Sequence, residues 1–519
     1  MNKKDKKKFY ISTSIVYASS RPHIGNLYEI ILSDVIARFK RMDGYDVYFQ
    51  TGTDEHGQKI EQKAIQKNFT PKEYVDFFSF EIEKIYKKMN IKYDYFARTT
   101  DSFHKNIVQK IVKKFFEQKD VYLGNYEGWY SVFEESYISE KDLIEGKTAS
   151  GETPIWAKEE VYFFKLSKYQ KKFLIFLEKN DNLIFPEKRK KEILNWLKEP
   201  LPDLSITRTS FKWGVELDFD PKHVVYVWVD ALMNYITGLR YDPTKKKEEQ
   251  SKKFLKYWPC DLHVIGKDIS RFHLVIWPIL LIALELPLPK HFLIHPWILF
   301  NNKKMSKSIN NVIYEKDLLK FFSVDSIRYF VLHEIPYNDD GIITYDIFSQ
   351  VYNSDLVNTL GNLLSRTIGL ISKYRDGKVK KISNFKKECE INLSQKSLET
   401  LPIIKKLMKE FKVGESLEKI MQLCRLCNKY IDLNQPWNLI KENKLEDLDF
   451  CLYNLIETIR FIGVLLKPFL PDTAEIILKQ IKAEKDSFES LNFFGLTKNK
   501  KLKKENKLFP RFEKKNFFN

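Results

Sequence analysis

Residues 9–54 alternate between apolar runs and one long amphipathic segment, and this pattern constrains the fold more than any other part of the chain. An apolar run at residues 9–17 predicts a strand. Apolar side chains at helical spacing then predict a helix from about Gly25 to Met42. A second apolar run at residues 45–50 predicts another strand, directly followed by polar residues. This order predicts a Rossmann-type parallel sheet with ligands at the carboxyl ends of its strands.

Later segments add two further kinds of predicted structure. Residues 70–115 have helical character, whereas short aromatic-rich runs and turns at residues 121–215 predict an inserted domain. Apolar runs at residues 224–229 and 262–266 predict strands that complete the sheet. From about residue 350 apolar side chains recur at helical spacing, which predicts an all-α domain. The predicted fold class is therefore α/β, a Rossmann-type parallel sheet with an insertion, followed by a helical bundle.

The composition limits the classes of partner and compartment. The chain has 519 residues and a formal net charge of +18, which suits a polyanion such as RNA, although an excess of Lys is also typical of an AT-rich genome. Five cysteines are too few and too irregular for a disulfide framework, and Cys424 and Cys427 are predicted to be core residues of a helix. The longest apolar run, residues 274–284, is too short to span a bilayer. We therefore expect a cytoplasmic protein without a membrane partner.

His23 and Asn26 stand at the start of the first predicted helix, directly after a turn containing Pro22. Backbone N–H groups and the helix dipole favour a phosphate there, and the imidazole and amide side chains add donors. Gly25 allows a ligand to approach the backbone closely. This motif alone is weak evidence, since a histidine in such a place is more often structural. Its position between a strand and a helix strengthens it.

A basic loop far along the chain supplies the complementary charges. Lys304 and Lys307 stand three positions apart in Lys304–Ser308, together with two serine hydroxyls. Most runs of lysine are solvated surface, but two ammonium groups and nearby donors can also bind a polyphosphate. Contacts that strengthen as charge develops on a departing pyrophosphate lower the barrier of the reaction.

Together these motifs resemble those of the class I methionyl-tRNA synthetases, and the resemblance spans about residues 9 to 512. It implies that methionine and ATP, with Mg²⁺ on the phosphates, give methionyl-adenylate and pyrophosphate, and that methionine then passes to the terminal adenosine of tRNA(Met) with its CAU anticodon. The matching segments include Tyr17, His23–Asn26, Thr51–Gly57, Tyr226–Ala231, Gly266–Ile269, Arg271–His273 and Lys304–Ser308. The implied ATP-binding residues are His23, Gly25, Asn26, Gly266, Lys304 and Lys307, of which His23, Asn26, Lys304 and Lys307 act in catalysis.

The resemblance also implies a methionine pocket and a division into domains. In the implied pocket, the carboxylate of Asp54 holds the substrate ammonium, and aromatic walls suit a polarizable thioether. Without the resemblance, these aromatic residues would be interpreted as ordinary core residues. The implied pocket residues are Ile15, Tyr17, Asp54, Trp228, Ala231, Leu232, Tyr235, Ile269 and His273. The expected domains are 1–120 and 216–300 (catalytic), 121–215 (inserted connective), 301–355 (Lys304–Ser308 loop and stem contact) and 356–519 (helical anticodon-binding, with a docked C-terminal tail).

The sequence departs from the family in two places. Asn26 stands where relatives usually have a second histidine, and an amide donates a hydrogen bond without carrying charge. Ser131 and Glu134 stand where many relatives have a zinc-binding Cys pair, and no Cys or His occurs from 125 to 160. A tetrahedral structural site needs four such ligands. We therefore expect no structural zinc.

The helical domain resembles the anticodon-binding bundle of the family. Asn362 and Arg366 lie one turn apart and share a helix face. Trp437 follows Pro436 at a predicted helix break, where an indole can stack on an anticodon base. Packing is the plainer interpretation of Trp437 alone.

Three other functions are alternatives to this one. Synthetases for Ile, Val or Leu need a large editing domain, because one methylene supplies only about 1–3 kcal/mol of discrimination, and the insertion at 121–215 is too short for that. A cysteinyl enzyme would need thiol and imidazole zinc ligands in its pocket, and the sequence lacks them there. An RNA-binding protein that has lost catalysis would be expected to lack His23, Lys304 or Lys307, and all three are present. The chain ends before the dimerising appendage that many relatives carry, so we expect a monomer.

Overall fold

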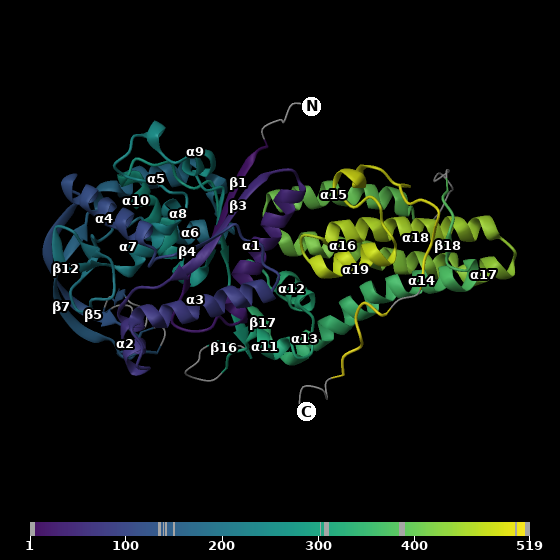
Figure 1. Ribbon diagram of the computed structural model, residues 1–519, viewed down its shortest axis with the longest axis horizontal. Helices are drawn as coiled ribbons and strands as arrows, with labels where there is room; N and C mark the ends of the chain where they lie inside the picture. Colours follow the sequence, from purple (N-terminus) through teal and green to yellow (C-terminus); the bar gives the residue numbers. More distant parts are fainter. Residues whose placement is uncertain are drawn as a thin grey trace. The chain divides into compact units, whose positions relative to one another are not determined.

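A seven-stranded parallel sheet organises the amino-terminal half of the protein (Figure 1). The computed structural model describes residues 6–132, 136–138, 140, 143–148, 151–301, 303–305, 311–382, 390–503 and 506–513. Its two compact units are Met1–Ser33 with Asp46–His295, and Asp34–Tyr45 with Pro296–Asn519. The sheet lies in the first unit, and its strands follow the order β4, β3, β1, β13, β14, β8, with the short β2 pairing beside the end of β3. The strands are β1 (Lys8–Thr13), β2 (Val16–Tyr17), β3 (Asp46–Asp54), β4 (Tyr95–Arg98), β8 (Ile184–Phe185), β13 (Leu262–Gly266) and β14 (Phe292–His295).

The first strand, helix and strand follow the predicted order. Helix α1 (Ile24–Met42) buries its apolar face, including Leu27 and Ile31, and Gly44 takes a φ of 90° just beyond its end. Strand β3 continues past the predicted limit to Asp54. A Cβ on Gly52 would lie 2.0 Å from the carbonyl oxygen of Ala97, so glycine allows β4 to approach β3 closely. The expected sheet is therefore confirmed at its amino-terminal strands.

Two predictions about local structure are wrong. Residues 95–98 were expected to be helical, yet they form β4 on the sheet edge. The apolar run at 224–229 does not join the main sheet. Strand β12 (Asp220–Val225) instead belongs to an antiparallel sheet with β10 (Thr207–Arg208) and β11 (Glu216–Leu217), and helix α7 (Val227–Leu232) follows. A short, fully buried apolar run has no periodicity that separates strand from helix.

The segment between α4 (Ser102–Glu117) and β13 supplies an antiparallel four-stranded sheet, in the order β6, β5, β7, β9. Strand β8 lies in the same stretch of chain but pairs with β14 of the main sheet. The strands of the antiparallel sheet are β5 (Val121–Ser131), β6 (Ser136–Ile138), β7 (Ile155–Phe164) and β9 (Leu204–Ser205). The other helices of the first unit include α2 (Gln58–Gln66), α3 (Pro71–Lys88), α4 (Ser102–Glu117), α5 (Leu166–Lys179), α6 (Glu187–Trp196), α8 (Asn234–Thr237), α9 (Lys252–Tyr257) and α10 (Trp277–Ala283).

The second unit is mainly helical, and its long helices pack alongside one another (Figure 1). A buried ion pair at 2.7 Å joins Arg328 of α12 (Val324–His333) to Asp34 of α1, and Arg328 also donates to the carbonyl oxygen of Phe469 at 2.8 Å. Near the end of the chain Phe509 and Phe512 are buried, and Phe512 packs on Phe322. The helices are α11 (Glu315–Leu318), α12 (Val324–His333), α13 (Tyr345–Val351), α14 (Asn362–Arg375), α15 (Leu393–Lys409), α16 (Val413–Asn434), α17 (Pro436–Lys441), α18 (Leu445–Leu466) and α19 (Pro471–Gln480), with a π-helical segment at Tyr352–Gly361.

Short strands complete the second unit. Strands β15 (Ile298–Phe300), β16 (Lys303–Lys304) and β17 (Gly341–Ile343) form one small sheet, and β18 (Lys378–Val379) pairs with β19 (Lys500–Lys501) in another. Among the described helices none combines the length and apolar character needed to cross a bilayer. The predicted core placement of the C-x-x-C pair is confirmed, since Cys424 and Cys427 are free thiols buried in α16.

Candidate active site

The residues that the sequence predicts to bind ATP at its amino-terminal motif lie at the start of α1. The backbone N–H of Gly25 donates to Nδ1 of His23 at 3.1 Å, and the N–H of His23 donates to Oδ1 of Asn26 at 3.1 Å. Because Nδ1 accepts, the proton of a neutral His23 ring lies on Nε2, which can donate to a phosphate oxygen. His23 and Gly25 are half-buried and Asn26 is exposed. Asn26 thus helps to order the turn through its carbonyl oxygen.

The carboxylate of Glu29, one helical turn after Asn26 on α1, forms hydrogen bonds at the ends of two strands. Glu29 is buried and accepts from the N–H and hydroxyl of Ser14, at 2.7 and 2.6 Å, beside the end of β1. Its other oxygen lies 2.9 Å from Nε2 of His295, at the end of β14. Sequence reasoning missed Glu29 and His295. The position of Glu29, three residues after Asn26, could have indicated that Glu29 lies near this motif. Nothing in the sequence links Glu29 to His295.

Gly266 ends β13 at the same edge of the sheet. A Cβ at this position would lie 2.8 Å from Oδ1 of Asp268 and 3.4 Å from Nε2 of His295. A larger residue would therefore disturb this corner. Lys304 lies on β16, its side chain is outside the described part of the chain, and Lys307 lies outside it altogether. The expected approach of both lysines to the phosphates stays a prediction.

The predicted methionine-pocket residues come from four segments of the first unit. Tyr17 of β2 pairs directly with Asp54 at the end of β3, and Ile15 is half-buried just before β2. Trp228, Ala231 and Leu232 lie on α7 and Tyr235 on α8. Ile269 and His273 lie on the two short helices after β13, Lys267–Ile269 and Phe272–Ile276. Tyr17, Trp228 and Ile269 pack against one apolar cluster, to which Leu232 and Tyr235 belong.

Aromatic rings define the middle of this group. The indole of Trp228 stacks on Phe272 with ring centroids 4.0 Å apart and planes 3° apart. The ring of His273 meets the same indole edge-on at 6.2 Å. Sequence reasoning quoted Phe272 within a motif but gave it no role. Only the fold shows that it covers one face of Trp228.

His273 is uncharged in this environment. Burial lowers its pKa to about 4. Its Nδ1 lies 3.1 Å from the carbonyl oxygen of Ile269, which can only accept, so Nδ1 carries the proton. Nε2 therefore accepts from the hydroxyl of Tyr235 at 2.8 Å, and burial raises the pKa of that hydroxyl well above its usual value. This side of the group thus carries no formal charge.

A buried carboxylate with two histidine partners lies on α7, the helix that carries Trp228. Asp230 of α7 accepts from Nδ1 of His56 at 2.7 Å and from Nε2 of His104 at 2.8 Å, and Nδ1 of His104 lies 2.8 Å from Oγ1 of Thr237. Burial by itself would raise the pKa of Asp230, but the two histidines outweigh it and hold the pKa at about 2. Asp230 is thus ionised at neutral pH. Sequence reasoning gave no role to these residues.

The predicted anticodon residues lie within the helical unit. Asn362 is exposed at the start of α14, and Arg366 on the next turn forms an ion pair with Asp432 of α16 at 2.7 Å. The expected helix break is present. Gln435 takes a φ of 42° between α16 and α17, and the half-buried Trp437 is the second residue of α17. Asp432 thus brings Arg366 next to the end of α16 that leads into Trp437.

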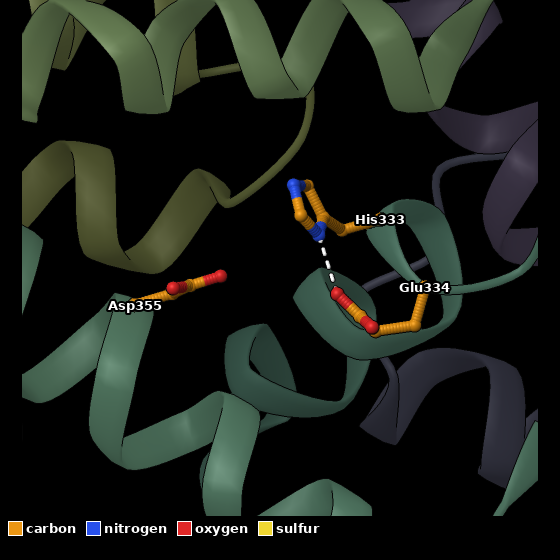
Figure 2. A group of neighbouring side chains, drawn as sticks. All are labelled: His333, Glu334 and Asp355. Carbon is orange, nitrogen blue, oxygen red and sulfur yellow. Dashed lines mark hydrogen bonds and ion pairs between the residues drawn. The ribbon is translucent and has the colours of Figure 1, made fainter.

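One side-chain group in the described residues has the composition of a metal site, namely His333, Glu334 and Asp355 (Figure 2). Nδ1 of His333 lies 2.6 Å from Glu334 and Nε2 lies 3.2 Å from Glu418. Asp355 accepts from the hydroxyl of Tyr329 at 2.7 Å. Although burial opposes the charged form, hydrogen bonds to Glu334 and Glu418 raise the pKa of His333.

Ser131 and Glu134 stand where the family resemblance implies a zinc-binding Cys pair. Ser131 ends β5 and its hydroxyl donates to Glu152. Glu134 lies outside the described residues. A hydroxyl bonded to a carboxylate lacks the soft thiolate donors of structural zinc sites.

Comparisons with known proteins agree with this geometry. The family model described as tRNA synthetases class I (M) matches residues 9–149 and 139–368, and that for the anticodon binding domain of methionyl tRNA ligase matches 384–511. The methionine–tRNA ligase of Clostridium acetobutylicum is 47% identical over 513 residues, covering 98% of this chain and 79% of the relative. That of Bacillus subtilis is 42% identical over 522 residues, covering 97% and 78%.

The solved structures give the same result. Mycobacterium tuberculosis methionyl-tRNA synthetase in complex with methionyl-adenylate matches with a TM-score of 0.92 at 36% identity, covering 97% of this chain and 100% of that chain. The sheet, the inserted strands and the helical unit are therefore those of a class I aminoacyl-tRNA synthetase. Within that class the chain belongs to the methionine–tRNA ligases. The predicted fold class and family are confirmed.

Proposed function

We propose that this chain activates methionine with ATP and transfers it to tRNA(Met). Its membership of the methionine–tRNA ligases carries the activity. The observation within the structure that best supports this activity is the uncharged aromatic group formed by Trp228 and His273. Trp228 lies two residues before Asp230 in the chain, and it packs against the same apolar cluster as Tyr17. The individual roles of the site residues are part of the proposal.

In the first step the carboxylate of methionine attacks the α-phosphate of ATP, and pyrophosphate leaves. No nucleophilic side chain of the protein is needed. Nε2–H of His23 and the amide of Asn26 would bind phosphate oxygens, and the dipole of α1 would favour their negative charge. Lys304 and Lys307 would stabilise charge on the pyrophosphate as it departs. Mg²⁺ enters with the nucleotide as part of the substrate.

Selection of methionine follows from charge and shape. The carboxylate of Asp54 would hold the substrate ammonium, and Tyr17, its partner across β2 and β3, lies beside it. The thioether would lie among Trp228, Tyr235 and His273. Because His273 is neutral and its Nε2 is occupied by the hydroxyl of Tyr235, the wall has no charge that would favour a polar side chain.

Recognition of tRNA is proposed for the helical unit. A splayed base of the CAU anticodon would stack on Trp437, a contact worth about 1–3 kcal/mol. Asn362 and Arg366 would contact neighbouring bases or phosphates, for which Arg366 must leave Asp432. We further propose that the enzyme works as a monomer in the cytoplasm and holds no structural zinc. Sedimentation of the purified chain tests its oligomeric state.

Amino-acid-dependent exchange of pyrophosphate into ATP tests the activity. Methionine should support exchange, and leucine, isoleucine, valine and cysteine should not. Exchange with one of these instead would mean a different amino-acid specificity. Exchange with none of them would mean an RNA-binding protein without catalysis, and in that case tRNA binding without charging should remain measurable.

A further inference from the structure

A two-stranded basic ribbon lies on the helices of the second unit. We define the basic ribbon as residues 378–381 and 498–503, which contain β18 and β19. In its antiparallel register Lys378 lies directly opposite Lys501, and Val379 opposite Lys500. Its lysines are Lys378, Lys380, Lys381, Lys498, Lys500, Lys501 and Lys503.

The basic ribbon is held firmly on the helices. The buried carboxylate of Glu457 on α18 accepts from the backbone N–H groups of Gly495, Leu496 and Thr497, at 3.0, 3.0 and 3.1 Å, just before the second half of the ribbon. Val379 and Leu502 are buried beneath it. A segment fixed in this way presents its exposed side chains in a defined arrangement.

One lysine of the ribbon serves to fix it. The ammonium of Lys500 donates to the carbonyl oxygens of Ile481 and Lys482, at 3.1 and 2.8 Å, beyond the carboxyl end of α19. Burial lowers the pKa of Lys500. A structural role thus accounts for Lys500, and it does not account for the exposed lysines beside it.

Few carboxylates compensate the remaining charge. Asp449 pairs with Arg375 at 2.7 Å and lies 3.9 Å from Lys380, and Glu484 pairs with Lys498 at 2.5 Å. Within the described residues no acidic side chain forms an ion pair with the exposed Lys378, Lys381, Lys501 or Lys503. Like charges directly opposite one another on two strands destabilise the pairing. A polyanion bound across Lys378 and Lys501 would relieve that repulsion.

The ribbon lies at the same end of α18 as the proposed anticodon site. Asp449, which holds Arg375 and Lys380, stands on the second turn of α18. Helix α17, with Trp437, ends only a few residues before α18 begins and packs against it. Figure 1 shows β18 and α17 near the same end of the helical unit.

We propose that the basic ribbon binds the phosphate backbone of tRNA beside the anticodon. This inference rests on the proposed function, because it takes tRNA as the partner. Lysines at fixed positions bind phosphates as point charges without reading bases. The ribbon would therefore supply affinity and orientation, while Trp437 and its neighbours supply sequence discrimination.

The test is the salt dependence of tRNA binding by the full-length chain. In the triple variant K378Q/K381Q/K501Q, the slope of log K against log salt should fall by roughly two to three, since each lost phosphate contact contributes about 0.7–0.9. Methionine-dependent pyrophosphate exchange should stay at the wild-type rate, which also shows that the variant is folded. The matched control is K396Q/K406Q/K409Q on α15, which removes the same charge elsewhere in the helical unit.

Two outcomes would overturn the inference. One is an unchanged slope in the ribbon variant, and the other is an equal fall in the α15 control, which would mean a response to net charge alone. Both are distinct from failure of the proposed function. If wild-type enzyme charges tRNA with methionine and the ribbon variant keeps its slope, the ribbon proposal alone is wrong.

Discussion

Nδ1 of His56 lies 2.7 Å from Oδ2 of Asp230, although 174 residues separate them in the chain. His56 stands two residues after Asp54, the proposed ligand of the substrate ammonium. Asp230 stands two residues after Trp228, the proposed wall for the thioether. One charge-assisted hydrogen bond therefore joins the two segments that must be correctly spaced for methionine to bind both groups at once.

Replacing Asp230 with Asn should impair methionine binding more than catalysis. The amide has one acceptor oxygen for two histidine donors, and losing a hydrogen bond to a charged group costs about 1.5–3 kcal/mol. In pyrophosphate exchange we expect the KM for methionine to rise about tenfold or more, with a smaller change in kcat at saturating methionine. The control is Asp242→Asn, whose carboxylate pairs with Lys110 at the surface. If the variant loses thermal stability but its KM for methionine is unchanged, the role of Asp230 is purely structural.

Replacing Lys307 with Ala should slow adenylate formation by roughly tenfold or more while leaving methionine affinity nearly unchanged. The reason is that its ammonium is proposed to contact the pyrophosphate most strongly as it departs. Single-turnover formation of methionyl-adenylate measures this directly. An unaltered rate would contradict the role assigned to the Lys304–Ser308 loop.

Replacing Trp437 with Ala should reduce tRNA charging and spare pyrophosphate exchange. Loss of one stacking contact, about 1–3 kcal/mol, corresponds to a rise of roughly fivefold to a hundredfold in the KM for tRNA. Trp437→Phe retains a ring for stacking and should recover part of the loss. Equal impairment in both assays would point to a folding defect.

The pH dependence of stability should report the neutral state of His273. Burial lowers its pKa from 6.5 to about 4, so between these values the unfolded chain binds more protons than the folded one. The stabilisation is complete above about pH 6.5 and is lost as the pH falls toward 4. In His273→Gln, which can still accept from Tyr235, the slope of the unfolding free energy over this range should be shallower by up to about 1.4 kcal/mol per pH unit. Urea denaturation at several pH values measures it, and an identical slope would mean that His273 is protonated in the native state.

Metal analysis of the purified chain should find no stoichiometric zinc. The hydroxyl of Ser131 donates to Glu152 at the position where the family resemblance implies a thiolate, and the nitrogens of His333 face Glu334 and Glu418. Dialysis against a chelator should leave exchange activity with added Mg²⁺ unchanged. One zinc per chain that resists dialysis would contradict this prediction.

The sequence by itself determined the features that depend on local order. Apolar spacing identified β1, α1 and the start of β3, the motif at His23 lies at the predicted helix start, and the C-x-x-C pair is buried in a helix. These succeed because strand and helix periods are properties of consecutive residues. The resemblance then supplied the family, which the comparisons confirmed.

Only the tertiary structure decided which distant groups meet. In the folded chain residues 227–232 form a buried helix and residues 95–98 lie on the sheet edge. Ser14 and His295 both contact Glu29, and His56 contacts Asp230. Local pattern is silent on such contacts, because a fully buried run shows no contrast between faces and a long-range hydrogen bond leaves no periodic trace in the chain. Composition and spacing thus determine the helices and strands, while the packing of the whole chain determines which residues pair with each buried charge.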